Sequence, residues 1–190
     1  MSKKIEDIHS NLFARALLKK TSLPIILVGI ITAFYLYIMS FINHQNYLFI
    51  YVIIALAVIK TIILSYSTIK QLSKLVKKCH SFSHLLWVFG LLIGLSIFSF
   101  ATDYTCLFQF NRDSFNGAIE GENYFLSLFQ FFYFSLTTFS TIGYGDISPA
   151  SDSARLLIIL EVFLSFLIIV FALSNISKMH INQDYKNDFK

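Results

Sequence analysis

The chain has 190 residues, of which 56% are hydrophobic and 14% are charged. A soluble protein of this length could not bury so much apolar surface, so the composition excludes a soluble class and predicts an all-α membrane protein. The net charge of +4 comes from lysines that flank the predicted spans. The sequence contains no basic soluble domain for nucleic acid, and no phosphate loop, nucleophile elbow or zinc motif that would indicate an enzyme or a small-molecule ligand.

Residues 1–22 form the first predicted element, an amphipathic helix on the cytoplasmic membrane surface. Their apolar positions recur at the spacing of one helix face: Ile5, Ile8, Leu12, Phe13, Ala16 and Leu17. A cleavable signal peptide would carry a continuous apolar stretch instead. Such a helix lies in the membrane interface and anchors the chain there.

Four apolar stretches reach the minimum of about 17 residues that a helix needs to cross a bilayer. They are 23–41, 47–66, 85–101 and 156–173. A fifth apolar run, 125–136, is too short to cross and leads directly into residues 141–146. We therefore expect four transmembrane helices and one re-entrant pore helix followed by a loop.

Lys60 is the charged residue of the first two predicted spans. It lies in the inner part of the second span, from which its long side chain could reach the cytoplasmic interface. We therefore interpret Lys60 as a topology anchor. The sequence leaves open whether residues 23–66 have a packing or a regulatory role.

The basic residues set the orientation, because Lys and Arg in short loops favour the cytoplasmic side. They concentrate before the first span and in the linker 67–84: Lys3, Lys4, Arg15, Lys19, Lys20, Lys70, Lys74, Lys77 and Lys78. The loop 42–46 has none. Both termini, including the polar tail 174–190, are therefore predicted to be cytoplasmic, and the loop 141–146 is predicted to open outward.

The segment between the third and fourth spans is predicted to be external. It is mostly acidic before residue 141, with Asp103, Asp113, Glu120 and Glu122 against Arg112. Cys106 falls in this predicted loop, where it could form a disulfide with another subunit. Cys79 is predicted to be cytoplasmic and reduced.

Residues 141–146 read T-I-G-Y-G-D and carry the main functional signal. Gly143 and Gly145 can adopt backbone angles that are forbidden to other residues, so the loop can turn successive carbonyl oxygens toward one axis. A dehydrated cation needs such oxygens to replace its hydration shell. A simple glycine-rich turn is the alternative. The membrane context favours an ion pathway, because irregular backbone is tolerated there only when it is buried in protein or lines a watery cavity.

Residues 85–173 resemble the pore module of tetrameric potassium channels in the pore-loop cation channel family. The filters of such channels read T-V-G-Y-G, and Ile142 adds one methylene to that pattern. The stretch Y-F-S-L-T-T-F-S before the loop and Ile147-Ser148-Pro149 after it resemble small prokaryotic channels. The resemblance implies a fourfold homotetramer in the lipid bilayer of the cell membrane.

The same resemblance implies that the filter binds potassium ions without any other cofactor. The expected ligands are the backbone carbonyls of Thr141, Ile142, Gly143 and Tyr144, together with the Thr141 hydroxyl, and Gly145 completes the filter. Tyr133 stands where relatives carry an aromatic brace, often Trp. We therefore expect Tyr133 to bond to Asp146 behind the ion path.

Glu161 is an acidic residue inside a predicted span, which is costly and indicates a functional role. We expect it to face the back of the pore helix and to accept hydrogen bonds from Thr137 or Thr138. A cavity-facing role as a cation attractor is the open alternative. Ser165 stands where the resemblance implies a hinge glycine, and it is the candidate gating residue.

The sequence therefore predicts a potassium-selective channel. The alternatives are a nonselective cation channel of the same architecture and a nonconducting regulatory subunit. The sequence does not choose a gating stimulus or the location of the gate.

Overall fold

The computed structural model describes residues 26, 29–31, 33–35, 37, 48–75, 82–118 and 124–187. In chain order the elements are α2 (Leu48–Leu75), α3 (Phe82–Phe110), η1 (Arg112–Ser114), β1 (Phe115–Asn116), α4 (Tyr124–Phe139), β2 (Ser148–Pro149) and α5 (Asp152–Asn187).

Three of the described helices are long and apolar enough to cross a membrane. The qualifying segments are Phe49–Lys70, Phe89–Phe110 and Asp152–Ser174. The predicted helical membrane fold is therefore confirmed. The predicted N-terminal helix 1–22 lies outside the described residues, as does most of the first span, whose described positions between 26 and 37 are helical.

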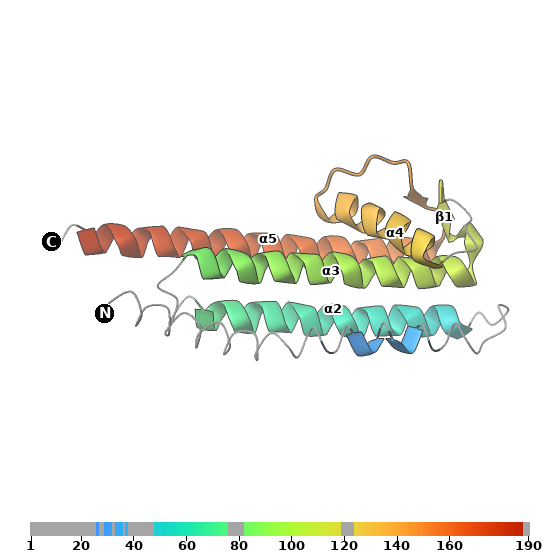
Figure 1. The fold of residues 1–190 in the computed structure, drawn as a ribbon, viewed down its shortest axis with the longest axis horizontal. Helices are drawn as coiled ribbons and strands as arrows, with labels where there is room; N and C mark the ends of the chain where they lie inside the picture. The colour runs from blue at the N-terminus through green and yellow to red at the C-terminus, as the bar shows by residue number, and fades with distance from the viewer. Residues whose placement is uncertain are drawn as a thin grey trace.

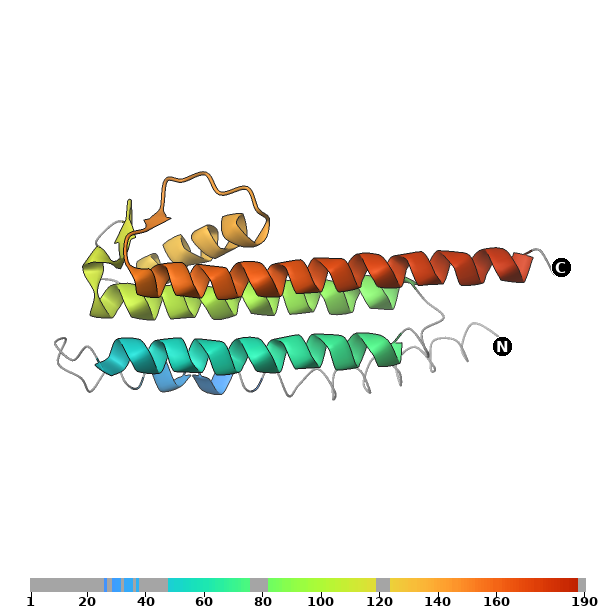
Figure 2. The same cartoon turned by 180° about the vertical axis from the view of Figure 1, so that it is seen from behind.

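The long helices α2, α3 and α5 lie side by side, and the shorter α4 packs at one end of them against α3 and α5 (Figures 1 and 2). α2 packs against both α3 and α5. The loop after α4 arches away from the bundle before the chain enters α5. This arrangement holds a short re-entrant helix against two membrane helices.

An aromatic cluster holds α4 on α3. Tyr104 and Phe108 of α3 meet Phe115, Phe131 and Phe134, and the ring centroids of these pairs lie 4.8 to 6.4 Å apart, mostly edge to face or tilted. Such pairs add about 0.5–1.5 kcal/mol each beyond the area they bury. The aromatic residues in the sequence around 131 therefore fix α4 against α3.

A two-residue antiparallel pair ties the two ends of the α4 region together. Phe115 lies opposite Pro149, and Asn116 lies opposite Ser148. The Ser114 carbonyl also accepts hydrogen bonds from the Ala150 and Ser151 amides, at 2.8 and 3.3 Å. The segment that follows residues 141–146 is thus fixed to the segment that follows α3.

α5 begins directly after this pair. The Ser151 hydroxyl accepts a hydrogen bond from the Ala154 amide at 3.2 Å, and Asp152 lies in the first turn. A hydroxyl at the N-cap and an acidic residue in the first turn both favour a helix start. The predicted tail 174–190 is helical as far as residue 187.

The predicted boundaries of α3 were wrong. The helix runs nine residues beyond the predicted end at 101, to Phe110, so Asp103 and Cys106 lie in a buried part of it and not in an external loop. Polar residues lower the hydropathy there, but the Thr102 and Thr105 hydroxyls bond to helix carbonyls at 2.7 Å and stay inside the helix. Cys106 is a free, buried cysteine that packs with Tyr35 and Ile53 of its own chain, so it is not exposed for the intersubunit disulfide that a loop position would have allowed. Cys79 lies outside the described residues.

Candidate functional site

The segment after α4 folds back onto the end of the pore helix. The Thr141 amide donates to the Thr138 carbonyl at 3.0 Å, and the Ile142 and Gly143 amides donate to the Thr137 carbonyl at 2.9 and 3.2 Å. These bonds satisfy carbonyls that a helix C-terminus leaves unpaired. The first three amides of this segment therefore point inward to α4.

The backbone conformation alternates along the same segment. The φ angles of Thr141, Gly143 and Gly145 are 58°, 54° and 79°, whereas Ile142 and Tyr144 have no positive φ. Thr141 bears a β-branched side chain, for which this region is strained. Among the described residues, no backbone amide donates a hydrogen bond to a carbonyl between 141 and 145. The amides of 141–143 thus bond to α4, while the carbonyls of 141–145 accept no backbone hydrogen bond.

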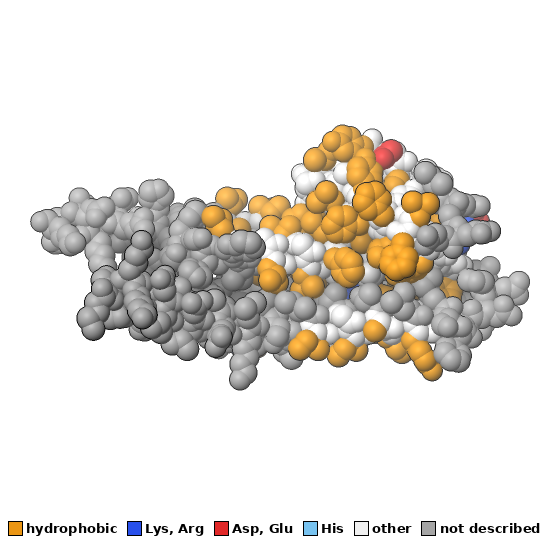
Figure 3. Space-filling model, viewed as in Figure 1, with side chains coloured by type: hydrophobic (Ala, Val, Ile, Leu, Met, Phe, Trp, Pro, Cys, Tyr) orange, Lys and Arg blue, Asp and Glu red, His pale blue; other side chains and the backbone are white. Residues whose placement is uncertain are grey.

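The side chains of the predicted filter are open to solvent in the single chain. Ile142 is 57% exposed and Tyr144 is 68% exposed. The Tyr144 ring stacks on Tyr133 of α4, with centroids 6.3 Å apart and planes 3° from parallel. Hydrophobic side chains gather over the α4 end of the molecule as well (Figure 3), including Phe125, Phe129 and Leu136.

Tyr133 also reaches the outer end of the segment. Its hydrogen bond with Asp146 raises the pKa of the Tyr133 phenol above its ordinary value. The same tyrosine therefore contacts both Tyr144 and Asp146, two of the residues that the sequence placed in or beside the filter.

Gly117 is a residue of this region that the sequence analysis missed. Its φ is +76°, and a Cβ atom at this position would lie 1.8 Å from the carbonyl oxygen of Asp146. No residue other than glycine fits without displacing the backbone of the segment. The Asn116-Gly117 pair is a turn signal, but nothing in the sequence indicates which backbone lies against the turn.

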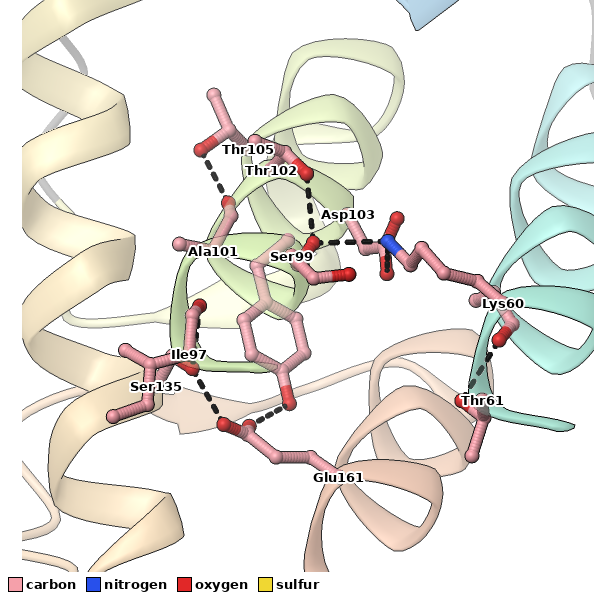
Figure 4. Close-up of polar contacts among 12 residues, drawn as sticks. Lys60, Thr61, Ile97, Ser99, Ala101, Thr102, Asp103, Thr105, Ser135 and Glu161 are labelled. Carbon is pink, nitrogen blue, oxygen red and sulfur yellow. Dashed lines mark hydrogen bonds and ion pairs between the residues drawn. The ribbon is translucent and has the colours of Figure 1, made fainter. Parts of the chain in front are cut away.

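Glu161 lies behind the pore helix and is fully buried. Its Oε2 accepts a hydrogen bond from the Tyr104 hydroxyl at 2.5 Å, and its Oε1 accepts one from the Ser135 hydroxyl at 2.5 Å. Figure 4 shows Glu161 and Ser135 facing each other across α4 and α5. The carboxylate therefore connects α3, α4 and α5.

The expected partners of Glu161 were wrong. Thr137 donates its hydroxyl to the Phe134 carbonyl of its own helix at 2.9 Å, and Thr138 contributes its backbone carbonyl to Thr141. The cavity-facing alternative is also wrong, because Glu161 is covered by α3 and α4. Tyr104 went unnoticed because the predicted third span ended before it.

Ser165 does not interrupt α5. Its hydroxyl donates to the Val162 carbonyl at 2.8 Å, and the helix is continuous from residue 152 to 187. A serine that bonds back to its own helix loosens it only slightly.

Lys60 is not at the membrane interface, so its predicted role as a snorkelling topology anchor was wrong. It is 2% exposed, and its Nζ lies 2.6 Å from Asp103 Oδ2 and 3.0 Å from the Ser99 carbonyl oxygen. Because Asp103 was assigned to a loop, the sequence offered no acidic partner at the depth of Lys60.

Comparison with known proteins matches the part of the chain that carries this site. The matching family model is described as an ion channel and covers residues 85–182, just over half of the chain. That range contains α4, the segment 141–146 and most of α3 and α5.

Three curated relatives illustrate the similarity. Two-pore potassium channel 4 of Arabidopsis thaliana is 36% identical over 87 residues, which are 43% of this chain and 29% of the relative. Voltage-gated potassium channel Kch of Escherichia coli (strain K12) is 45% identical over 67 residues, or 32% and 15% of the two chains. Potassium channel K2 of Plasmodium falciparum is 36% identical over 83 residues, or 42% and 5%.

The match thus spans less than a third of the length of each of these relatives. No solved structure matches the chain. Because the family match takes in more than half of the residues and the whole candidate site, the chain belongs to this ion channel family.

Proposed function

We propose that four copies of this chain form a potassium-selective channel that conducts K⁺ passively. The carbonyl oxygens of Thr141, Ile142, Gly143 and Tyr144, with the Thr141 hydroxyl, would coordinate the ions. The observation that carries this proposal is the alternation of φ along 141–145 together with the available carbonyls. The names of the three relatives, all potassium channels, support it.

The alternating backbone explains how one short segment can supply several ligands. In a strand successive carbonyls point to opposite sides, whereas reversals of φ at every second residue bring neighbouring carbonyls to one side. The amide bonds to Thr137 and Thr138 fix the other side of the segment on the pore helix. Such carbonyl rings replace the hydration shell of the ion.

The proposed tetramer follows from the same segment. One chain lines only one side of the ion path, so several copies are needed to enclose it. Ile142 and Tyr144 are exposed in the single chain and would be covered in a closed assembly. Homo-oligomers favour closed symmetry. We place the assembly in the cell membrane, with both termini cytoplasmic and the segment 141–146 facing outward, since the lysines favour that orientation.

The test is ion flux through purified protein in liposomes. The wild type should take up potassium or rubidium rapidly while sodium is excluded. Gly143→Ala should abolish uptake, because alanine rarely adopts the φ of +54° that Gly143 has. Gly90→Ala is the matched control, because a Cβ there meets no atom within 4 Å. Wild-type protein without flux would refute the proposal.

A nonselective cation channel is the second candidate. Tyr144 is held by its stack on Tyr133, and Asp146 by its bond to the same residue. This intact outer half favours selectivity, because it keeps the outer ion sites in place. Reversal potentials measured under opposed potassium and sodium gradients decide between the two, and equal permeabilities would establish the nonselective channel.

A further inference from the structure

Lys60 and Asp103 form an ion pair in the middle of the helices that cross the membrane. Lys60 is 2% exposed and Asp103 is fully buried. The Lys60 ammonium also lies 5.9 and 5.8 Å from the ring centroids of Tyr35 and Phe100. The pair joins α2, which precedes the pore module, to α3, which is its outer helix.

Such a pair calls for an explanation other than stability. Replacing a buried ion pair by apolar residues of similar volume is often neutral or stabilising, whereas buried pairs are known to fix register. Ionisable residues within the membrane are by default candidates for function. Here Lys60 contacts two residues one helical turn apart on α3, because it also bonds to the Ser99 carbonyl. Lys60 therefore fixes both the position of that turn along the axis of α3 and its rotation about that axis.

The turn that Lys60 holds is the one that supports the pore helix. Tyr104 follows Asp103 directly, and successive residues of a helix point about 100° apart, so the two side chains leave α3 toward different neighbours. Tyr104 donates to Glu161 of α5, and Glu161 accepts from Ser135 of α4. Ser135 also lies 3.0 Å from the Ile97 carbonyl of α3. Figure 4 shows the ion pair on one side of α3, with Glu161 and Ser135 on the other.

We propose that Lys60 is a positioning residue for the filter, acting from α2 through Asp103, Tyr104 and Glu161 on Ser135 of the pore helix. Ser135 lies two residues before Thr137, whose carbonyl holds the Ile142 and Gly143 amides. The helix before the pore module thereby influences how long the filter stays conductive. This inference rests on the proposed channel function.

The experiment compares four variants of the full chain in lipid nanodiscs and bilayers. Lys60→Met breaks the pair. Lys60→Met with Asp103→Leu removes both charges, so that no unpaired carboxylate prevents folding. Lys60→Arg keeps a cation. Thr68→Val is the matched control, because Thr68 is a buried polar residue of α2 whose hydroxyl bonds to Leu64 of its own helix at 2.8 Å.

Two properties are measured on each assembled variant. The first is the open probability of single channels, and the second is amide hydrogen exchange in the second half of α4. Both Lys60→Met variants should lower the open probability about 5-fold or more, the lower end of coupling between separate sites, and should speed exchange in α4. Lys60→Arg should restore both properties, and Thr68→Val should change neither.

A double-mutant cycle then separates positioning from general packing. In a Ser135→Ala background, Lys60→Met should have little further effect, because the link to the pore helix is already cut. Additive effects, or a charge-free double variant with wild-type exchange and open probability, would overturn the inference. Amide hydrogen exchange can be measured on a protein that carries no ion current. A wild type that fails to conduct would therefore refute the channel function, while the connection from Lys60 to α4 could still be tested by exchange.

Discussion

At the scale of single residues, the candidate filter depends on contacts that its own motif does not reveal. Gly117 touches the Asp146 carbonyl, Tyr133 bonds to Asp146, and Tyr104 supports Glu161. Each contact joins residues from separate elements. Substitution at these positions should therefore act on the filter without altering any proposed ion ligand.

Gly117→Ala should damage the outer end of the filter. The added Cβ would meet the Asp146 carbonyl oxygen at 1.8 Å, and its φ of +76° is strained for alanine, which costs about 1–3 kcal/mol before the clash is counted. We expect a lower thermal unfolding temperature and reduced potassium selectivity, measured by unfolding in detergent and by reversal potential. Gly90→Ala, with open space around it, should leave both unchanged, and an unaltered Gly117→Ala channel would contradict the observed contact.

Tyr133→Phe should remove a pH dependence at alkaline pH. The hydrogen bond with Asp146 raises the pKa of Tyr133, so the protonated phenol is favoured in the folded state. Its contribution is complete below the ordinary tyrosine pKa of about 10 and is lost as the pH rises through the higher folded value. The stability that this hydrogen bond gives the filter should therefore not change with pH near neutrality, and it should fall at strongly alkaline pH. The wild type and Tyr133→Phe are compared by unfolding across that pH range. The same loss of stability at alkaline pH in both proteins would show that the Tyr133 phenol is not its cause.

Tyr104→Phe should destabilise the protein while keeping the aromatic cluster. The variant retains the ring packed on Phe131 and Phe134 but leaves a buried Glu161 oxygen without its donor. The expected loss is about 1–3 kcal/mol in the free energy of unfolding. Tyr51→Phe is the matched control, because Tyr51 is 70% exposed. Equal effects of the two substitutions would mean that the Glu161 contact has no energetic weight.

At the scale of elements, helix existence could be predicted from the sequence and helix ends could not. Long apolar runs identified α2, α3 and α5, because a span must be apolar along its length. The last turns of α3 were misread because Asp103 and Thr105 are polar, although Asp103 pairs with Lys60 of α2 and the Thr105 hydroxyl bonds to the Ala101 carbonyl of its own helix. Tyr104, one of the two partners of Glu161, was missed for the same reason, since it lies in those turns.

The re-entrant α4 was recognised from its length and from the motif that follows it. Its support could not be predicted, because Ser135 bonds to residues 26 and 38 positions away in the sequence. Gly117 illustrates the same limit, since its closest neighbour across the fold is Asp146. Local patterns identify the residues, whereas pairing across the fold depends on the packing of α3, α4 and α5.

α5 also carries a prediction at this scale. The helix is continuous through Ser165, which bonds to Val162. Ser165→Ala should change stability little, whereas Ser165→Gly should cost about 0.5 kcal/mol and make the helix easier to bend. Open probability and thermal unfolding measure the two effects. A large change in open probability with Ser165→Ala would show that the hydroxyl itself takes part in gating.

At the scale of the whole molecule, the proposed channel needs more than one chain. Its filter segment and much of α4 expose apolar side chains, including Ile142, Tyr144 and Phe129. We expect native mass spectrometry of the detergent-solubilised protein to give four copies. A conducting protein with fewer copies would contradict a pore built from one filter segment per chain.

The ion pair between α2 and α3 has an electrical consequence. Moving one elementary charge through the membrane field is worth about 2.3 kcal/mol per 100 mV, but Lys60 and Asp103 carry opposite charges 2.6 Å apart. If the two helices move together, the charges cross the field as a neutral unit and almost no electrical work is done. The membrane potential therefore has little effect on the position of these two helices. Any stimulus that moves α2 must act on it mechanically or by chemical binding.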